Sequence, residues 1–179
     1  FECLAAYTLL QKALISIGED PGDIQLIYGE NEKPYIKDSD IFFNLSHSEG
    51  TAACVLSPYE TGCDIECSDT DRLVIAKRKF CREEYGLLLS EPDESKRRKL
   101  FNRIWTVKES VMKALGTGLL LPLNSFSVSF DSDTVHVAYE NINKTLYFRE
   151  YPLPQVTASF CCAAFTPEAL PANITFINL

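Results

Sequence analysis

The sequence predicts an α+β fold built from two similar halves. Three observations lead to this prediction. With 179 residues, the chain is long enough for one ordinary domain or two small halves. Apolar residues recur at helical spacing near the N-terminus and again in the middle of the chain. Strand-like segments follow each helical region, so we place an N-terminal half at 1–61 and a C-terminal half at 62–179.

The N-terminal half is expected to begin with a helix over residues 4–17, because its leucines recur on one face. Gly18 is the expected C-cap of this helix. Apolar runs then predict short strands at 24–28, 41–45 and 52–57. A turn at 58–62 leads into a further strand at 63–66.

The C-terminal half is expected to continue with helices before it returns to strands. Two short helices are predicted at 72–79 and 83–89, and the longest helix at 94–115. Pro92 and Asp93 precede this long helix, and Gly116 and Gly118 stop it. The remaining strands are predicted at 126–130, 134–139, 145–151, 157–165 and 174–177.

Composition excludes several classes of protein. A net charge of −8 argues against general nucleic-acid binding, which depends on a basic surface. No apolar run reaches the roughly 20 residues of a membrane-spanning helix, and no signal peptide is visible. The seven cysteines fit neither a zinc site nor a small disulfide scaffold, so we expect reduced thiols. We therefore expect a cytoplasmic protein with no nucleic-acid partner and no membrane partner.

Two carboxylates are predicted to share one face of the strand that follows the turn at 58–62. Asp64 and Glu66 are two residues apart, and alternate residues of a strand face the same way. Adjacent carboxylates repel each other, and a cation between them relieves this repulsion. Hard oxygen ligands suit Mg²⁺ or Mn²⁺. The alternative is an exposed strand that carries two acids and no metal.

Three charged residues of the long helix stand out. Glu109 and Lys113 lie one turn apart at the edge of its apolar arc. They fit either a base beside a phosphate-rich ligand or a surface ion pair of about 0.3–0.5 kcal/mol. Lys108 falls inside the apolar arc, so its ammonium group must either extend to solvent or find an anionic partner.

His47 lies between Ser46 and Ser48 at the end of an apolar strand. This arrangement fits either a phosphate-contacting turn or a structural histidine in a turn. The spacing supports neither a Ser-His-acid triad nor a Gly-rich phosphate loop. Two basic runs, at 77–79 and 96–99, fit solvated helix faces, and the run at 96–99 is alternatively a docking surface for acidic carrier helices.

Together, these tracts resemble the successive signatures of the surfactin-type phosphopantetheinyl transferases. The matching tracts are Asn-Leu-Ser-His-Ser at 44–48, Gly-Cys-Asp-Ile-Glu at 62–66 and Trp-Thr-Val-Lys-Glu-Ser at 105–110. Lys113, Gly116 and Gly118 extend the third tract. Glu-Lys-Pro-Tyr-Ile at 32–36 and the segment 121–128 also resemble family tracts. The resemblance runs in order over nearly the whole chain.

The resemblance implies two pseudo-symmetric α+β halves with coenzyme A and the active site in the cleft between them. It implies a Mg²⁺ site, with Mn²⁺ as an alternative, formed by Asp64, Glu66 and Glu109. It implies a coenzyme A site formed by Lys33, Pro34, Ser46, His47, Asp64, Lys108, Glu109 and Lys113. It assigns catalytic roles to Glu109, as the favoured base, and to Lys113, beside the pyrophosphate.

The implied reaction is transfer of the phosphopantetheine arm of coenzyme A to a serine hydroxyl of an acyl or peptidyl carrier protein. The enzyme would be Mg²⁺-dependent, release adenosine 3′,5′-bisphosphate and act as a monomer. Carriers of fatty-acid, polyketide, nonribosomal-peptide and lysine biosynthesis all fit.

Two departures from the family pattern leave alternatives open. The N-terminal half looks truncated, because the segment that usually precedes the first helix is not in this sequence, and Glu32 replaces a usual glycine. One alternative is therefore a catalytically weakened relative that only binds carrier proteins or coenzyme A. The other is a Mg²⁺-dependent phosphohydrolase that uses the same acids.

Overall fold

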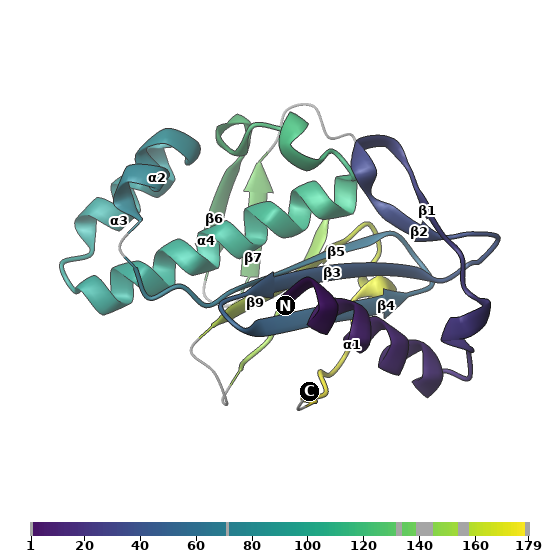
Figure 1. Cartoon of the computed structure of the whole chain (residues 1–179). Coiled ribbons are helices and arrows are strands. Elements are labelled where there is room, and N and C mark those ends of the chain that lie inside the picture. Colours follow the sequence, from purple (N-terminus) through teal and green to yellow (C-terminus); the bar gives the residue numbers. More distant parts are fainter. Residues whose placement is uncertain (1, 71, 132–133, 139–144, 154–157, 178–179) are drawn as a thin grey trace.

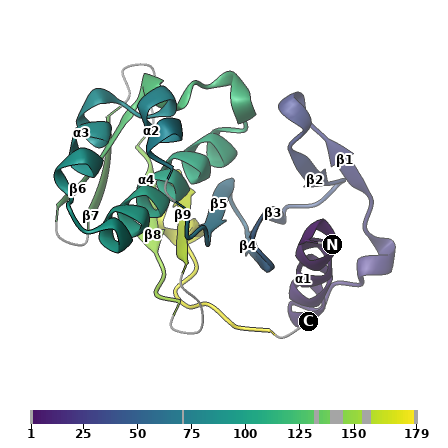
Figure 2. The same ribbon diagram turned by 60° about the vertical axis from the view of Figure 1, so that its left-hand side comes forward.

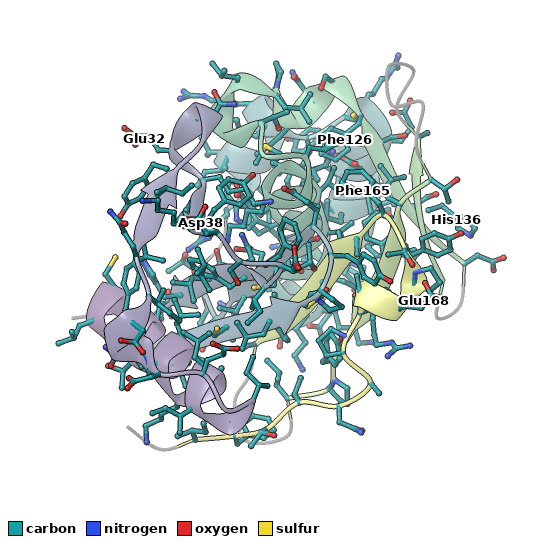
Figure 3. All side chains as sticks on the ribbon, turned by 90° about the vertical axis from the view of Figure 1, so that its right-hand side faces the viewer. Glu32, Asp38, Phe126, His136, Phe165 and Glu168 are labelled. Atoms are coloured by element: carbon teal, nitrogen blue, oxygen red, sulfur yellow. The ribbon has the colours of Figure 1, made fainter. Side chains whose placement is uncertain are left out.

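The first α-helix and the first four strands of the chain form what we call the N-terminal half. The computed structural model describes the chain except for residues 1, 71, 132–133, 139–144, 154–157 and 178–179. In Figure 1 the half consists of α1 (Glu2–Ser16), β1 (Leu26–Tyr28), β2 (Pro34–Ile36), β3 (Phe42–Ser48) and β4 (Thr51–Ser57). β1 pairs with β2 and β3 pairs with β4, both antiparallel. Figure 3 shows Glu32, in the turn between β1 and β2, at the outer margin of the molecule.

In its described residues, the C-terminal half contains three further α-helices and five strands. Its elements are β5 (Thr61–Glu66), α2 (Leu73–Lys79), α3 (Arg82–Ser90), α4 (Glu94–Leu115), β6 (Ser127–Asp131), β7 (Thr134–Ala138), β8 (Tyr147–Glu150) and β9 (Ser159–Ala164). β9 lies between β5 and β8 in an antiparallel sheet, and β6 pairs with β7. Figure 2 shows this half beside the N-terminal half.

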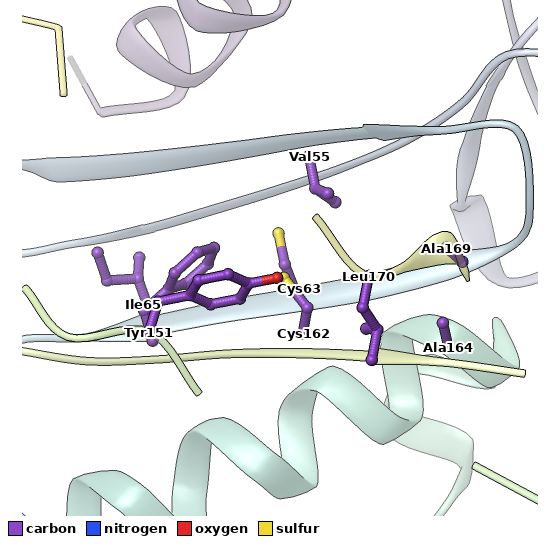
Figure 4. Packing of buried hydrophobic residues seen from close by; sticks show 9 residues of the cluster. Val55, Cys63, Ile65, Tyr151, Cys162, Ala164, Ala169 and Leu170 are labelled. Atoms are coloured by element: carbon purple, nitrogen blue, oxygen red, sulfur yellow. The ribbon is translucent and has the colours of Figure 1, made fainter. Parts of the chain in front are cut away.

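Each half buries one helix against antiparallel strands. In the N-terminal half, α1 packs on β3 and β4, and Leu10, Leu14 and Phe43 form its core. In the C-terminal half, α4 lies along β5 and β9 (Figure 1). The other side of β5 and β9 packs a second apolar cluster, which includes Tyr151 and Leu170 (Figure 4). The predicted α+β class is confirmed. None of the helices in the described part of the chain is long and apolar enough to cross a membrane.

Gly62 allows α4 to lie directly against β5. A Cβ atom at this position would collide with the carbonyl oxygen of Ser110 and the amide nitrogen of Ala114. The two backbones therefore approach each other more closely than any side chain would permit. This contact places the last turns of α4 over the segment that carries Asp64.

Polar side chains of β3 join the two halves. Asn44, Ser46 and Ser48 alternate along β3 and therefore point the same way. Asn44 Oδ1 accepts a hydrogen bond from the amide of Cys63 at 2.8 Å, and Ser46 Oγ accepts one from the amide of Ile65 at 3.2 Å. Ser48 Oγ accepts a third, from the amide of residue 67 at 3.1 Å. These side chains therefore provide hydrogen-bond acceptors for backbone amides along the edge of β5 that does not face β9.

The observed elements follow most of the sequence predictions. Helix 94–115 has the predicted bounds, and the other helices differ by one or two residues at their ends. β3 extends to Ser48, so His47 belongs to a strand and not to a turn. No strand forms at 174–177. The predicted strand ends at 139 and 157 lie outside the described residues.

Candidate active site

A cavity of about 290 Å³ opens where the two halves meet. Its wall combines α1, the turn before β2, strand β3 and the C-terminal end of α4. Four residues that the sequence singled out line this cavity: Lys33, Pro34, His47 and Lys113. At the end of α4, Gly116 also contributes, with a φ of 67° in the left-handed region that favours glycine.

Lys113 connects the cavity to the first carboxylate. Its Nζ lies 2.7 Å from Asp64 Oδ1 and donates to the carbonyl oxygen of Cys63 at 3.1 Å. Burial is the largest single influence and acts to lower the pKa of Lys113, but the charges of Asp64, Cys63 and Glu109 and the hydrogen bond to Asp64 together outweigh it, so the pKa is raised. Lys113 therefore presents a protonated ammonium group at the cavity wall.

Ser46 binds the same oxygen of Asp64 as Lys113 does. Its hydroxyl donates to Asp64 Oδ1 at 2.7 Å while its oxygen accepts the amide of Ile65. Ser46 is only 5% exposed and lies behind the described residues that line the cavity. The structure therefore places Ser46 beside a predicted metal ligand, whereas its neighbour His47 is exposed and faces the cavity.

Glu66 is held at both carboxylate oxygens. Ser48 Oγ donates to Oε1 at 2.8 Å, and the Arg72 guanidinium lies 2.7 Å from Oε2. The amide of Ser68 also donates to Oε1. Glu66 therefore has a fixed orientation on the same strand as Asp64, as the alternation of β5 predicted.

Glu109 differs from the other two acids because its carboxylate accepts no hydrogen bond within the described part of the chain. Burial, followed by the charges of Asp64 and Glu66, raises the pKa of Glu109 to about 7, and Lys113 only partly opposes this rise. A carboxyl with a pKa near neutrality is suited to accept and release a proton.

The three carboxylates offer oxygen ligands of the type that a hard divalent cation prefers, and their charges interact. They are not drawn together as a ligand set, however. Within the described residues, no three His, Cys, Asp or Glu side chains converge closely enough to hold a metal ion. Asp64 and Glu66 are instead neutralised by Lys113 and Arg72. A bound cation would replace these two basic groups as the counter-charge of the acids.

The expected position of Lys108 in the coenzyme A site is not observed, because the structure does not bring its side chain to the cavity. The side chain is fully buried on the other side of α4. Its Nζ lies 2.8 Å from Glu84 Oε1 and donates to the carbonyl oxygens of Leu123 and Phe126. The expected contact with a pyrophosphate is therefore replaced by an internal ion pair. Of the two arrangements open from the sequence, Lys108 has the anionic partner.

Several residues that complete the site were not singled out from the sequence. Asn44, Ser48, Glu60, Arg72 and Glu84 orient the predicted residues or neutralise their charges. One signal was available, because Asn44, Ser46 and Ser48 alternate as polar residues along an otherwise apolar strand. The partners of Lys33 and Lys108 are distant in the sequence and carry no comparable signal.

Comparison with known proteins identifies the family that the sequence motifs resemble. Residues 60–164 match the 4′-phosphopantetheinyl transferase superfamily. The chain is 31% identical over 168 residues to the 4′-phosphopantetheinyl transferase gsp of Aneurinibacillus migulanus, covering 93% of this chain and 70% of that protein. It is 35% identical over 161 residues to the 4′-phosphopantetheinyl transferase Sfp of Bacillus subtilis, covering 89% and 70%.

A solved structure with partial likeness is the holo-[acyl-carrier-protein] synthase of Thermotoga maritima. Its TM-score is 0.49 at 16% sequence identity, and the match covers 59% of this chain and 61% of that chain.

Proposed function

The chain belongs to the 4′-phosphopantetheinyl transferase superfamily and is an enzyme of that class, and from this premise we propose its full reaction. It transfers the phosphopantetheine arm of coenzyme A to a serine hydroxyl of an acyl or peptidyl carrier protein and releases adenosine 3′,5′-bisphosphate. The observation that carries the proposal is the cavity between the halves, which Lys33, His47 and Lys113 line. Lys113 contacts Asp64, and the charges of Lys113, Asp64 and Glu66 act on Glu109.

Several residues of the cavity together bind a phosphate-rich donor in this proposal. Lys33 and Lys113 offer ammonium groups from opposite halves of the chain, and His47 lines the same cavity and offers a ring nitrogen. Ammonium groups and imidazoles bind phosphate oxygens through charge-assisted hydrogen bonds. Pro34 shapes the wall beside Lys33. In this proposal Ser46 orients Asp64 and does not contact the donor.

Asp64, Glu66 and Glu109 are the residues that would hold Mg²⁺, with Mn²⁺ as an alternative. A divalent cation held there would supply positive charge that offsets the negative charge of the donor pyrophosphate. Lys113 already lies against Asp64, so it is placed to stabilise the departing bisphosphate as negative charge develops there. Arg72 and Ser48 keep Glu66 oriented in the absence of the cation.

Glu109 is proposed as the base that takes the proton of the carrier serine. Its pKa of about 7 lets it accept a proton and release it again near neutral pH. No hydrogen bond within the described part of the chain holds its carboxylate, so it is available to an incoming hydroxyl or to a water molecule.

We also propose the division into halves at 1–61 and 62–179, a monomeric enzyme, and no nucleic-acid or membrane partner. A cytoplasmic location is supported by the cysteines, because all seven are free thiols.

Mass spectrometry of a panel of carrier proteins, incubated with the enzyme, coenzyme A and Mg²⁺, tests the proposal. A carrier that gains one phosphopantetheine arm, and gains none in the presence of a chelator, is the expected result. Consumption of coenzyme A without any carrier would indicate a phosphohydrolase. Binding of coenzyme A without transfer to any carrier would indicate a relative that only binds.

A further inference from the structure

Lys33 is already paired with an acid in the cavity wall. Its Nζ lies 2.9 Å from Glu60 Oε2. Glu60 belongs to the turn that precedes β5, whereas Lys33 precedes β2, so the ion pair connects the hairpin β1–β2 to the segment that leads into β5. Glu60 also acts on a second cavity neighbour: burial, followed by the charge of Glu60, raises the pKa of Tyr35.

The two partners differ in how firmly they are held. The Lys33 side chain is 8% exposed, and the Glu60 side chain is 36% exposed. Lys33 packs beside Gly116 at the end of α4, and its Nζ lies 5.6 Å from the centre of the Tyr35 ring. The ammonium group is therefore fixed by its surroundings. The Glu60 carboxylate, which also interacts with the Tyr35 hydroxyl, is the more exposed partner of the pair.

The charge of the cavity makes this pair important for an anionic ligand. Both lysines among the described lining residues are neutralised, Lys33 by Glu60 and Lys113 by Asp64. Glu32 adds a further carboxylate to the wall. A phosphate-bearing donor therefore meets a cavity in which each ammonium group already has an acid as its counter-charge, and the donor phosphate competes with that acid for the same positive charge.

We propose that Glu60 is a specificity-determining residue, a resident carboxylate that competes with a donor phosphate for the ammonium group of Lys33. The inference rests on the proposed function, since it concerns the same donor in the same cavity. Glu60 lowers the affinity for coenzyme A and makes binding depend on exchange of one anion for another. A ligand without phosphate gains nothing from this exchange, so Glu60 acts only on phosphate-bearing ligands.

Calorimetry of coenzyme A binding in the presence of Mg²⁺, with wild type and Glu60→Gln, tests the proposal. The amide keeps the shape of the side chain but removes its charge. We expect Glu60→Gln to bind coenzyme A about two- to fivefold more tightly at low salt, the range typical of a partly exposed ion pair. The gain should shrink as ionic strength rises.

Three controls separate this competition from other effects. Glu32→Gln removes the same charge from the same wall, but Glu32 makes no ion pair within the described residues, so its effect should be smaller. Pantetheine, which carries no phosphate, should bind both proteins equally. In a Lys33→Met background, Glu60→Gln should give no further gain, because the competition requires the lysine.

Weaker binding of coenzyme A by Glu60→Gln would overturn the inference, because it would show that Glu60 serves to hold Lys33 in place. An equal gain for pantetheine, or an equal gain from Glu32→Gln, would also overturn it. Failure of the proposed function is a separate result. In that case the wild-type protein itself neither binds coenzyme A nor modifies any carrier protein.

Discussion

The carboxyl of Glu109 has a pKa raised from its usual 4.5 to about 7, so it links folding stability to pH. The folded protein binds this proton more tightly than the unfolded chain, and stability is therefore lost as pH rises from 4.5 to 7. The cost is about 1.4 kcal/mol for each pKa unit. Glu109→Gln removes the ionisation, so its advantage in melting temperature over wild type should grow across this window. Thermal unfolding in chelator, from pH 4 to 8, measures the difference, and parallel profiles would contradict the assignment.

The same substitution tests the catalytic role of Glu109. An amide cannot accept a proton, so kcat should fall roughly 10²–10⁴-fold, the usual contribution of a positioned base. Coenzyme A should still bind, because Lys33, His47 and Lys113 remain in the cavity. Single-turnover transfer to a carrier protein provides the measurement. Recovery of the rate by added Mg²⁺ alone would show that Glu109 is only a metal ligand.

The buried pair of Lys108 and Glu84 predicts a stability effect with no direct effect on the cavity. Both side chains are fully buried, and Glu84 also accepts the amide of Val128 at 2.6 Å. Lys108→Met leaves the charge of Glu84 without its partner, which should destabilise the fold by about 3–5 kcal/mol. Adding Glu84→Gln should restore part of this loss. Urea unfolding of the single and double variants measures these free energies of unfolding. Additive losses of unfolding free energy in the double variant would argue against the ion pair.

At the scale of elements, the contact between β5 and α4 depends on Gly62. A methyl group there would overlap with the backbone of α4, so Gly62→Ala should force the helix away from the strand. We expect destabilisation of about 1–3 kcal/mol or more, the range typical of overpacking. We also expect weaker coenzyme A binding, because Lys113 would lose its position against Cys63 and Asp64.

Gly86 in α3 provides the matched control. A Cβ atom there meets nothing within 4 Å, and alanine is favoured over glycine in a helix by roughly 1 kcal/mol. Gly86→Ala should therefore leave coenzyme A binding unchanged and should not lower the unfolding free energy. Equal behaviour of the two variants would show that the close approach at Gly62 has no special role.

Helix α4 shows which parts of the structure can be read from the sequence. Its start at the Asp93 cap, its end at Gly116 and the positions of Glu109 and Lys113 follow from local signals. The partner of Lys108 cannot be read from the sequence. The helical wheel places Lys108 in the apolar arc but does not identify Glu84 as its partner. Strand β3 was predicted too short, because its last three residues are polar. The role of Ser46 and Ser48 as hydrogen-bond acceptors for β5 and the residue after it depends on a contact between distant segments.

At the scale of the whole molecule, the basic run at 96–99 lies on a chain of net charge −8. Lys96 and Lys99 are exposed, whereas Arg97 donates to the carbonyl oxygen of Glu91 and Arg98 pairs with Glu94. Only the two lysines are therefore free to attract an acidic carrier helix. Charge reversal, Lys96→Glu with Lys99→Glu, should slow association with the carrier and flatten its salt dependence.

The matched control for this reversal uses Lys12 and Lys37, exposed lysines of the N-terminal half. Lys12→Glu with Lys37→Glu changes the net charge equally but at a different surface. Stopped-flow association with a carrier protein should separate the two double variants, while coenzyme A binding stays constant in both. Equal association rates for wild type and the reversal at 96 and 99 would assign that run to an ordinary solvated helix face.

The joint between β3 and β5 also governs how the protein behaves towards its own copies. A strand with unpaired amides at a sheet edge is a template on which another chain can add a strand. In β5 and just beyond it, the amides of Cys63, Ile65 and Cys67 are already occupied by side chains of β3. The edge is therefore closed to intermolecular sheet formation. The side chains that orient the acids beside the cavity thus also protect the protein against aggregation.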